Sequence, residues 1–417
     1  MSRVSLRVTF GIDGSEGRRL SRSGADAPIL DRGTGSTSNA SRTTGRLPLL
    51  VALSILTVLL LSVSYAFVAS DTPTSPSVVI TYSPRAPIIV DNDTDFAAQA
   101  LAGSWPGSGT VGDPYVIAGY QIDGLSYANC IYIANTTVHF VVMDCLVENS
   151  NTGIALMNLT NGNLVDNTCS NEVFGISLDS CDDNTVSGNN CSNCDDGIIF
   201  HYSSNNTIAS NNCSNDHWDA LSIFNSSNNT LVNNTCSYSV NYGIALVGDC
   251  INNTLSNNTC SYNGGVSGIM IEYSSNGNNL SNNTVSNNAG YGVMIDPYSV
   301  GTSSNNRIWN NTLYHNNGAG DVYDASHIQA YDDGIGNWWN STDGYGNYWS
   351  DWTSPDSDLD GIVDDPYLLD GMAGAADYYP LTTPQVPIPE FGAMPFVVIV
   401  LLVTVLLARE ARRRKVQ

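Results

Sequence analysis

Gly175-Ile176-Ser177-Leu178 is followed, after a polar turn, by Thr185-Val186-Ser187-Gly188-Asn189-Asn190-Cys191, and both elements return along the chain every 22 to 28 residues. The first element, Gly-Ile-x-Leu or a close variant, begins at residues 153, 175, 197, 220, 243, 268 and 292. The second is an aliphatic residue in an Asn- and Thr-rich context, centred on Leu164, Val186, Ile208, Leu231, Leu255, Leu280 and Ile308. Each unit therefore holds two short strands of alternating apolar residues, separated by turns.

The repeat decides the fold class. Two strands of three or four residues cannot close a core, whereas stacked copies can, because every backbone group then pairs with the coil above and below. Coils of about 22–28 residues with two or three short strands predict an all-β fold, a right-handed parallel β-helix or solenoid. Ile, Leu and Val are expected to face the inside. The repeated Asn at one turn position is expected to form an amide ladder.

The ten cysteines follow the repeat. One slot on successive coils holds Cys169, Cys191, Cys213, Cys236 and Cys260, and the next two coils place Val285 and Leu313 there. Replacement by Val and Leu indicates an inward, apolar slot, so these Cys are interpreted first as small buried residues. Two alternatives stay open. The first is a set of disulfides, either between stacked neighbours of the column or locally, joining Cys191 to Cys194 or Cys130 to Cys145. A column of soft-metal ligands is less favoured, because none of the five His shares the slot.

Charge divides the chain into three parts. The chain carries 15 basic and 39 acidic residues, a formal net charge of -24, yet residues 70–390 hold 34 acidic residues and only two Arg. Phosphate backbones are recognised by rows of Lys and Arg, so a segment this acidic excludes nucleic acid as a partner.

The N-terminal 85 residues predict export of the rest of the chain. Residues 1–46 hold eight Arg and few apolar residues, and are expected to be a disordered, cytoplasmic segment. Residues 47–69 are apolar and uncharged, long enough for a transmembrane helix, although small residues near Tyr65 also suit a signal peptide. The basic flank stays inside, so the linker 70–85 and everything after it face outward.

The C-terminus mirrors this arrangement. A proline-rich spacer at 384–390 leads to an apolar stretch at 391–408, a second predicted transmembrane helix, and to a basic tail at 409–417 that stays in the cytoplasm. Pro389-Glu390-Phe391 before the helix resembles the PEF-type sorting signals of archaeal surface proteins, which implies processing by an archaeosortase. An ordinary tail anchor is the alternative. Both predict a membrane-anchored domain on the cell surface.

The segments flanking the repeat resemble the NosD-like right-handed β-helix family. The resemblance rests on Asp113-Pro114-Tyr115 before the coils and, after them, on Gly346-Asn347-Tyr348-Trp349, Asp365-Pro366-Tyr367 and Tyr378-Tyr379-Pro380. It covers about residues 86–383. It implies a β-helix with an N-terminal cap over 86–315 and a Trp-rich C-terminal cap over 316–383, of a class found in carbohydrate-binding proteins and sugar hydrolases. The family's copper role does not transfer easily, because no His-x-x-x-Met or Cys/His cluster is present.

An acidic loop in the C-terminal cap predicts a structural calcium site. Asp356-x-Asp358-x-Asp360-Gly361 places carboxylates at every second position of a turn, with Gly where the chain reverses. Ile362 would add a backbone carbonyl, and Asp364 or Asp365 the later ligand. Tyr367 stands where an EF-hand has its bidentate Glu, and the alternative is a solvated acidic turn.

Four tryptophans beside this loop have two interpretations. Trp338, Trp339, Trp349 and Trp352 lie within fifteen residues. They are expected first to plug the open end of the β-helix, because an uncovered last coil invites pairing with another chain. Stacking on a glycan is the functional interpretation, and both hold if one ring face stays open.

The chain offers a weak case for catalysis. Inverting glycoside hydrolysis needs two carboxylates roughly 6.5–9.5 Å apart, but Asp182-Asp183 and Asp195-Asp196 occupy different positions of adjacent coils. A lyase needs a base beside Ca²⁺, and only Arg307 is available on the coils. An acidic uronate would also be repelled by the net charge. No catalytic residue is therefore assigned.

Sequons are frequent in the exported region but are inflated by the Asn-Thr repeat. Candidate N-glycosylation sites include Asn92, Asn135, Asn158, Asn205, Asn228, Asn252, Asn279, Asn310 and Asn340.

The sequence thus predicts a membrane-anchored surface rod that binds glycans, or adheres to other surface proteins, without catalysis. A polysaccharide lyase or hydrolase and a purely structural, glycosylated envelope protein are the alternatives.

Overall fold

The computed structural model describes residues 82–125, 127–296, 298 and 302–384. Both predicted membrane segments, the PEF motif and the two basic ends lie outside these residues. Within the described ranges, no helix has the length and apolar character that crossing a bilayer requires.

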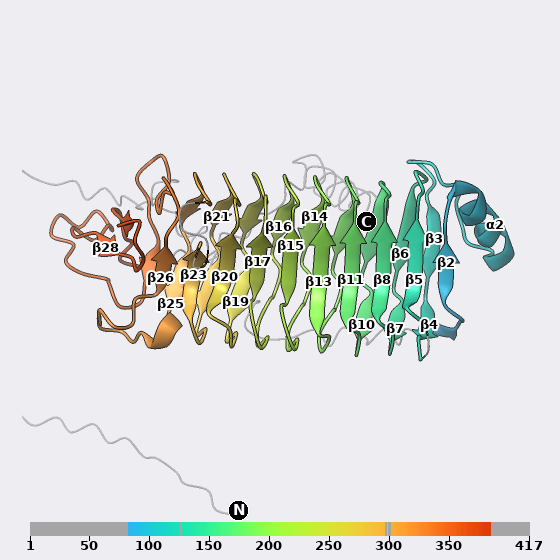
Figure 1. Ribbon diagram of the computed structural model, residues 1–417, viewed down its shortest axis with the longest axis horizontal. Helices are drawn as coiled ribbons and strands as arrows, with labels where there is room; N and C mark the ends of the chain where they lie inside the picture. The colour runs from blue at the N-terminus through green and yellow to red at the C-terminus, as the bar shows by residue number, and fades with distance from the viewer. Residues whose placement is uncertain (1–81, 126, 297, 299–301, 385–417) are drawn as a thin grey trace, which may run out of the picture. The chain divides into compact units, whose positions relative to one another are not determined.

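Most of the described chain is a parallel β-helix with three faces (Figure 1). The ten-stranded face consists of β2 (Ile88–Val90), β5 (Asn129–Ala134), β8 (Thr152–Met157), β11 (Phe174–Asp179), β13 (Asp196–His201), β15 (Leu221–Phe224), β17 (Ile244–Val247), β20 (Ser267–Glu272), β23 (Tyr291–Ile295) and β26 (Ala330–Asp332). The nine-stranded face consists of β3 (Tyr115–Ala118), β6 (Phe140–Met143), β9 (Gly162–Val165), β12 (Thr185–Ser187), β14 (Thr207–Ala209), β16 (Thr230–Val232), β18 (Thr254–Ser256), β21 (Asn279–Ser281) and β24 (Arg307–Trp309).

The third face is interrupted in the middle of the stack. Its two four-stranded parts are β1 (Ser83–Pro84), β4 (Tyr120–Asp123), β7 (Leu146–Glu148) and β10 (Thr168–Ser170), then β19 (Thr259–Ser261), β22 (Thr284–Ser286), β25 (Thr312–Tyr314) and β27 (Tyr348–Trp349). Single bridges through Asn190, Asn212 and Thr235 join the two parts. The predicted β-helix is therefore confirmed.

The core is built from the repeat positions. Ile176 pairs in register with Ile154 on one side and Ile198 on the other, and all three side chains are fully buried. The Cys slot is inward as predicted, since Cys260 is level with Val285 and Leu313. All ten cysteines are buried and free, so neither the stacked nor the local disulfide alternative is present in the structure.

Asparagine ladders close the turns. In one ladder Asn234 Nδ2 donates to the carbonyl of Ile208 at 2.9 Å, and Asn234 Oδ1 accepts from the backbone of Asn211 at 3.0 Å. The same pattern runs from Asn167 to Asn347, and a second ladder runs from Asn184 to Asn337. The spacing between rungs grows from 22 to 28 residues along the repeat, as the sequence indicated, and widens to 31 and 36 residues at the last rungs.

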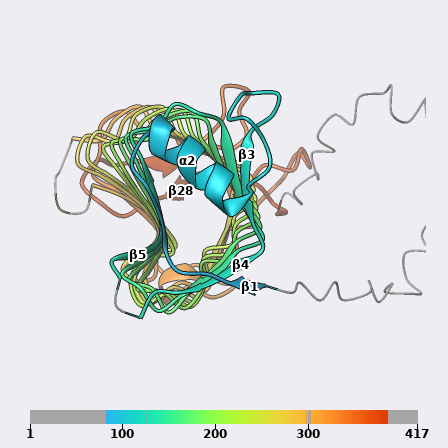
Figure 2. The same ribbon diagram turned by 90° about the vertical axis from the view of Figure 1, so that its right-hand side faces the viewer.

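The first coil is covered by a helix that the sequence pattern did not predict. Helix α2 (Asp93–Gly103) lies across the open end (Figure 2). Asn92 caps it by accepting from the Asp95 backbone at 2.9 Å, and Phe96 is buried against Tyr115 with ring centroids 5.1 Å apart. With two acidic residues in its first turn and a single apolar stripe, α2 covers apolar core that would otherwise meet water.

The last coil is covered by the C-terminal module, residues 316–384. It contains the 3-10 turn η1 (Asn316–Gly318) and a two-stranded antiparallel sheet of β28 (Tyr367–Leu368) and β29 (Ala376–Asp377). Trp349 stacks on Tyr367 at 4.0 Å and packs against Trp339 at 6.0 Å. All three rings are at most 1% exposed, which is the plug predicted from the sequence.

Candidate functional site

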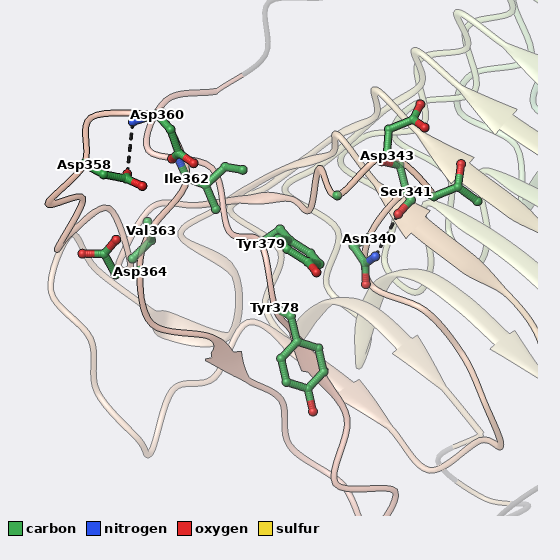
Figure 3. A pocket seen from close by; sticks show the side chains of 12 residues that line it. Asn340, Ser341, Asp343, Asp358, Asp360, Ile362, Val363, Asp364, Tyr378 and Tyr379 are labelled. Carbon is green, nitrogen blue, oxygen red and sulfur yellow. Dashed lines mark hydrogen bonds between the residues drawn. The ribbon is translucent and has the colours of Figure 1, made fainter.

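A cleft of about 560 Å³ opens on the C-terminal module (Figure 3). On one side lies the acidic loop 356–364, here called the Asp loop, and on the other the segment 340–344, with Tyr379 between them. These pieces come from separate parts of the sequence, which the module folds together.

The Asp loop curls around its own carboxylates. Asp356 Oδ2 accepts from the Gly361 backbone at 3.2 Å, and Asp360 Oδ1 accepts from the Ile362 backbone at 2.8 Å. Gly361 has φ +89°, a left-handed conformation that other residues rarely adopt, so the glycine allows the chain to reverse. The loop is held to the module because the Val363 backbone donates to the Pro380 carbonyl at 2.7 Å.

This curl brings together three of the predicted metal ligands. One carboxylate oxygen from each of Asp356, Asp358 and Asp360 lies within 4.8 Å of the others. Asp356 Oδ1 is buried and has no hydrogen-bond partner. A buried carboxylate oxygen without a partner costs free energy unless a cation or proton compensates it. Carboxylate oxygens are the ligand type that a hard cation such as Ca²⁺ takes, so these three residues could hold one.

The remaining predicted ligands are divided. Ile362 and Asp364 line the same cleft as Asp358 and Asp360, and Asp364 also accepts from the Ser357 backbone at 3.0 Å. Asp365 is not among the lining residues, and its carbonyl accepts from the Trp352 indole at 3.0 Å. Neither Asp364 nor Asp365 belongs to the cluster of three carboxylates, and Asp364 is the one of the two that lines the cleft.

Two tyrosines that the sequence analysis did not assign to a site border the cleft. Tyr378 is 63% exposed and Tyr379 is 42% exposed. The fully buried Asp377 positions them, because its carboxylate accepts from the Tyr379 backbone at 3.1 Å and from the Trp349 indole at 2.9 Å. Burial raises the pKa of Asp377 to about 6. The sequence signal that could have indicated these two residues is the Tyr378-Tyr379-Pro380 motif shared with the NosD-like family.

The four predicted glycan-stacking tryptophans separate into different roles. Trp339 and Trp349 are enclosed in the plug and leave no ring face for a sugar, so the stacking interpretation is wrong for both. Trp352 is half-buried and packs edge-on against Tyr367. Trp338 is 43% exposed and keeps the capacity to stack.

The residues considered for catalysis are not brought together. Asp182 and Asp183 follow β11, where Asp182 accepts from the Ser204 backbone at 2.7 Å. Asp195 and Asp196 lie one turn later at the start of β13, where Asp195 faces His217 at 3.3 Å. Arg307 belongs to β24, at the far end of the nine-stranded face from β3. Neither of these two acid pairs therefore has Arg307 beside it.

The predicted glycosylation sites differ in access. Six of the Asn are exposed: Asn92, Asn135, Asn158, Asn205, Asn228 and Asn252. The other three, Asn279, Asn310 and Asn340, are partly buried. In the Asn205-Asn206-Thr207 sequon the first Asn is exposed with φ 58°, while Asn206 is a buried ladder rung. Within this sequon, the Asn that would be glycosylated is accessible, and the neighbouring Asn is the one that stabilises the turn.

Comparison with known proteins identifies a family. Residues 110–354 match the model of the family described as periplasmic copper-binding protein (NosD). No curated protein matches. Among solved structures, the periplasmic alginate epimerase AlgG is 17% identical, with 56% of this chain and 71% of that chain covered and a TM-score of 0.37. An alginate lyase from Paenibacillus is 15% identical, covering 63% and 97%, with a TM-score of 0.40. Similarity this low says nothing about this chain's substrate.

The copper in the family description has no matching donor set in the described residues. Copper prefers imidazole nitrogen or soft sulfur. Within the ranges that the structure covers, the one cluster of three or more metal-ligating side chains is the carboxylate group of the Asp loop. The Cys column is sealed in the apolar core, where each of its side chains is fully buried, and no His lies in the same column.

The family assignment therefore rests on the match, which spans more than half of the chain and includes most of the β-helix. Its periplasmic description agrees with the outward location predicted for residues 70–390. The chain belongs to the NosD family of periplasmic β-helix proteins.

Proposed function

We propose that this protein is a surface-exposed, Ca²⁺-dependent glycan-binding β-helix that does not cleave its ligand. The observation that carries the proposal is the cleft beside the Asp loop, which is lined by Asp358, Asp360 and the rings of Tyr378 and Tyr379. Behind the lining, the Asp356 carboxylate, with its unpartnered oxygen, completes the carboxylate cluster.

The chemistry of this cleft suits a sugar. A Ca²⁺ ion takes six to eight oxygen ligands, so a cage of three or four protein groups leaves positions for hydroxyl oxygens of a bound glycan. Tyrosine rings offer an apolar face for a sugar ring and a phenol for hydrogen bonding. Asn340, Ser341 and Asp343 on the opposite wall add polar groups that fix orientation.

Several features oppose an enzymatic role. Hydrolysis or elimination needs an acid and a base positioned on either side of one bond. The described acid pairs lie on separate turns, and Arg307 is remote from them along the nine-stranded face. Binding without turnover is what this arrangement supports.

The proposal includes a location that the sequence predicts. The two apolar segments at 47–69 and 391–408, with their basic flanks, would anchor the domain at the cell surface, and Pro389-Glu390-Phe391 would direct processing by an archaeosortase. Presentation on the surface gives the cleft access to polysaccharide outside the cell.

The test is to incubate the purified full chain with neutral and acidic polysaccharides in Ca²⁺ or in chelator. Bound glycan, new reducing ends and unsaturated products are followed together. We expect retention in Ca²⁺, release on chelation and neither product. Cleavage would show an enzyme. No retention of any glycan, whether or not Ca²⁺ is present, would instead favour the structural envelope role.

A further inference from the structure

A second cleft, of about 480 Å³, lies on the other side of the 340–344 segment. Ser341, Thr342 and Asp343 line both clefts, so the two adjoin. Its other wall is formed by Arg307 and Trp309 at the end of the nine-stranded face, together with Trp338, which forms a single bridge with Arg307.

Register shows that this wall differs from the rest of its face. Arg307 pairs in register with Asn279, which follows Thr254 and Thr230 on the preceding coils. Trp309 likewise follows Ser281 and Ser256. These positions flank the buried Leu280 and Ile308, so they point outward. The small polar side chains of the coils directly before the cleft are thus replaced by a cation and an indole where the cleft forms.

Among the described residues, the Arg307 side chain contacts an aromatic ring but has no polar partner. Its guanidinium lies 5.0 Å from the centre of the Trp338 ring, and no described side chain or carbonyl accepts a hydrogen bond from it or forms an ion pair with it. An Arg with free donors is unexpected in a segment with 34 acidic residues and one other Arg. Even Asp343, which lines the same cleft, does not pair with it.

The side chains around Arg307 determine which kind of ligand the second cleft can bind. The planar guanidinium presents parallel N–H donors that match a carboxylate and is held in place by the ring beneath it. Trp309 is fixed because its indole donates to Asn279 Oδ1 at 2.9 Å. Tyr345, 51% exposed, and Trp338, 43% exposed, offer ring faces, and Asp343 offers an acceptor for a hydroxyl.

From this geometry we propose that the second cleft is a subsite for a carboxylate-bearing sugar, a uronate, whose carboxylate binds Arg307. The inference rests on the proposed glycan-binding function and names the class of sugar. The acidic surface does not forbid it, because charges more than about 8 Å away are largely screened at physiological ionic strength. The proposed ion pair between Arg307 and the sugar carboxylate is a direct contact, so the same screening does not weaken it to that extent.

The test compares polygalacturonate with its fully methyl-esterified form, which removes the charge and keeps the sugar. The purified full chain in Ca²⁺ should bind the acid roughly tenfold or more tightly than the ester, as expected for a charge-assisted hydrogen-bonded pair. Arg307→Thr should abolish this preference. Thr occupies the same register on preceding coils, so the variant is expected to fold. Arg307→Lys keeps the charge without the fork and should retain only part of the preference.

Arg85→Thr is the matched control. Arg85 is the other Arg of the acidic segment, and its guanidinium also lies on rings, 5.1 Å from Trp105 and 4.7 Å from Tyr120, at the opposite end of the β-helix. The Arg85→Thr variant should keep the preference for polygalacturonate over its methyl ester.

The outcomes separate the two proposals. Equal or absent binding of acid and ester by the wild type, or a preference that survives Arg307→Thr, would overturn the uronate subsite. Ca²⁺-dependent retention of neutral glycans in that case would leave the proposed function standing. Failure of the wild type to retain any glycan would overturn both the uronate subsite and the proposed glycan-binding function. A sulfated galactan bound in place of polygalacturonate would also contradict the carboxylate assignment.

Discussion

Asp216 shows how one residue in a repeat sets a pH dependence. It is 1% exposed and occupies a ladder position that Asn263 and Asn288 fill on later coils, accepting from the Cys194 backbone at 2.9 Å. Asn263 donates through Nδ2 to the Cys236 carbonyl at 3.1 Å, whereas Asp216 Oδ2 has no partner. Burial raises the pKa of Asp216 to about 8. In the native protein this acid therefore keeps its proton at neutral pH.

We predict that Asp216→Asn stabilises the fold and flattens its pH dependence. The unfolded chain releases the Asp216 proton near pH 4 while the native chain holds it to about pH 8, so stability at this site falls as pH rises between these values. The gain from Asn should grow across this window by at most about 1.4 kcal/mol per pH unit. Denaturant melts of both proteins from pH 4 to 9 measure it.

The exposed Asp249→Asn is the control for the same change in charge. It should leave the slope of stability against pH unchanged. Parallel pH profiles for the wild type and Asp216→Asn would show that Asp216 is not held neutral.

At the scale of the element, the ladders stabilise the turns. Asn234 is 1% exposed and makes rung-to-rung hydrogen bonds in both directions. Its neighbour Asn233 is exposed, with φ 58°, and makes the turn. The adjacent Asn residues thus have separate tasks, one internal and one conformational.

We predict that Asn234→Ala destabilises the β-helix by roughly 2–5 kcal/mol, because two buried groups, the Ile208 carbonyl and the Asn211 amide, lose their partners. Asn233→Gly should cost little, since glycine adopts the left-handed conformation freely. Equilibrium unfolding in urea gives both values. Similar losses for the two variants would contradict the division of tasks.

The ladders also mark what a sequence alone can reveal. The Asn repeat predicted a ladder because identical residues recur, and two continuous Asn ladders are present in the structure. A third column is chemically mixed, with Cys194, Asp216 and Ser239 before Asn263, so no recurring letter indicates it. Helix α2 was missed for a related reason, because it occurs once and its apolar stripe is short.

At the scale of the whole molecule, the β-helix is a scaffold that carries both proposed binding clefts at its C-terminal end. Coil, core and Cys column were predictable because each follows a period. The clefts were only partly predictable. The Asp loop is local in sequence, but the clefts also need Tyr379, the 340–344 segment and the end of the nine-stranded face. Their convergence depends on how the C-terminal module folds over the last coil, which no local spacing encodes.

The most direct test of Ca²⁺-dependent glycan binding is glycan retention by the wild type and Asp360→Asn, each in Ca²⁺ and in chelator, beside melting curves. We predict that the wild type retains glycan and melts at higher temperature in Ca²⁺, because an ion bound only by the native state stabilises it. Asp360→Asn should behave in Ca²⁺ as the wild type does in chelator. Retention that survives both chelation and the substitution would contradict the account.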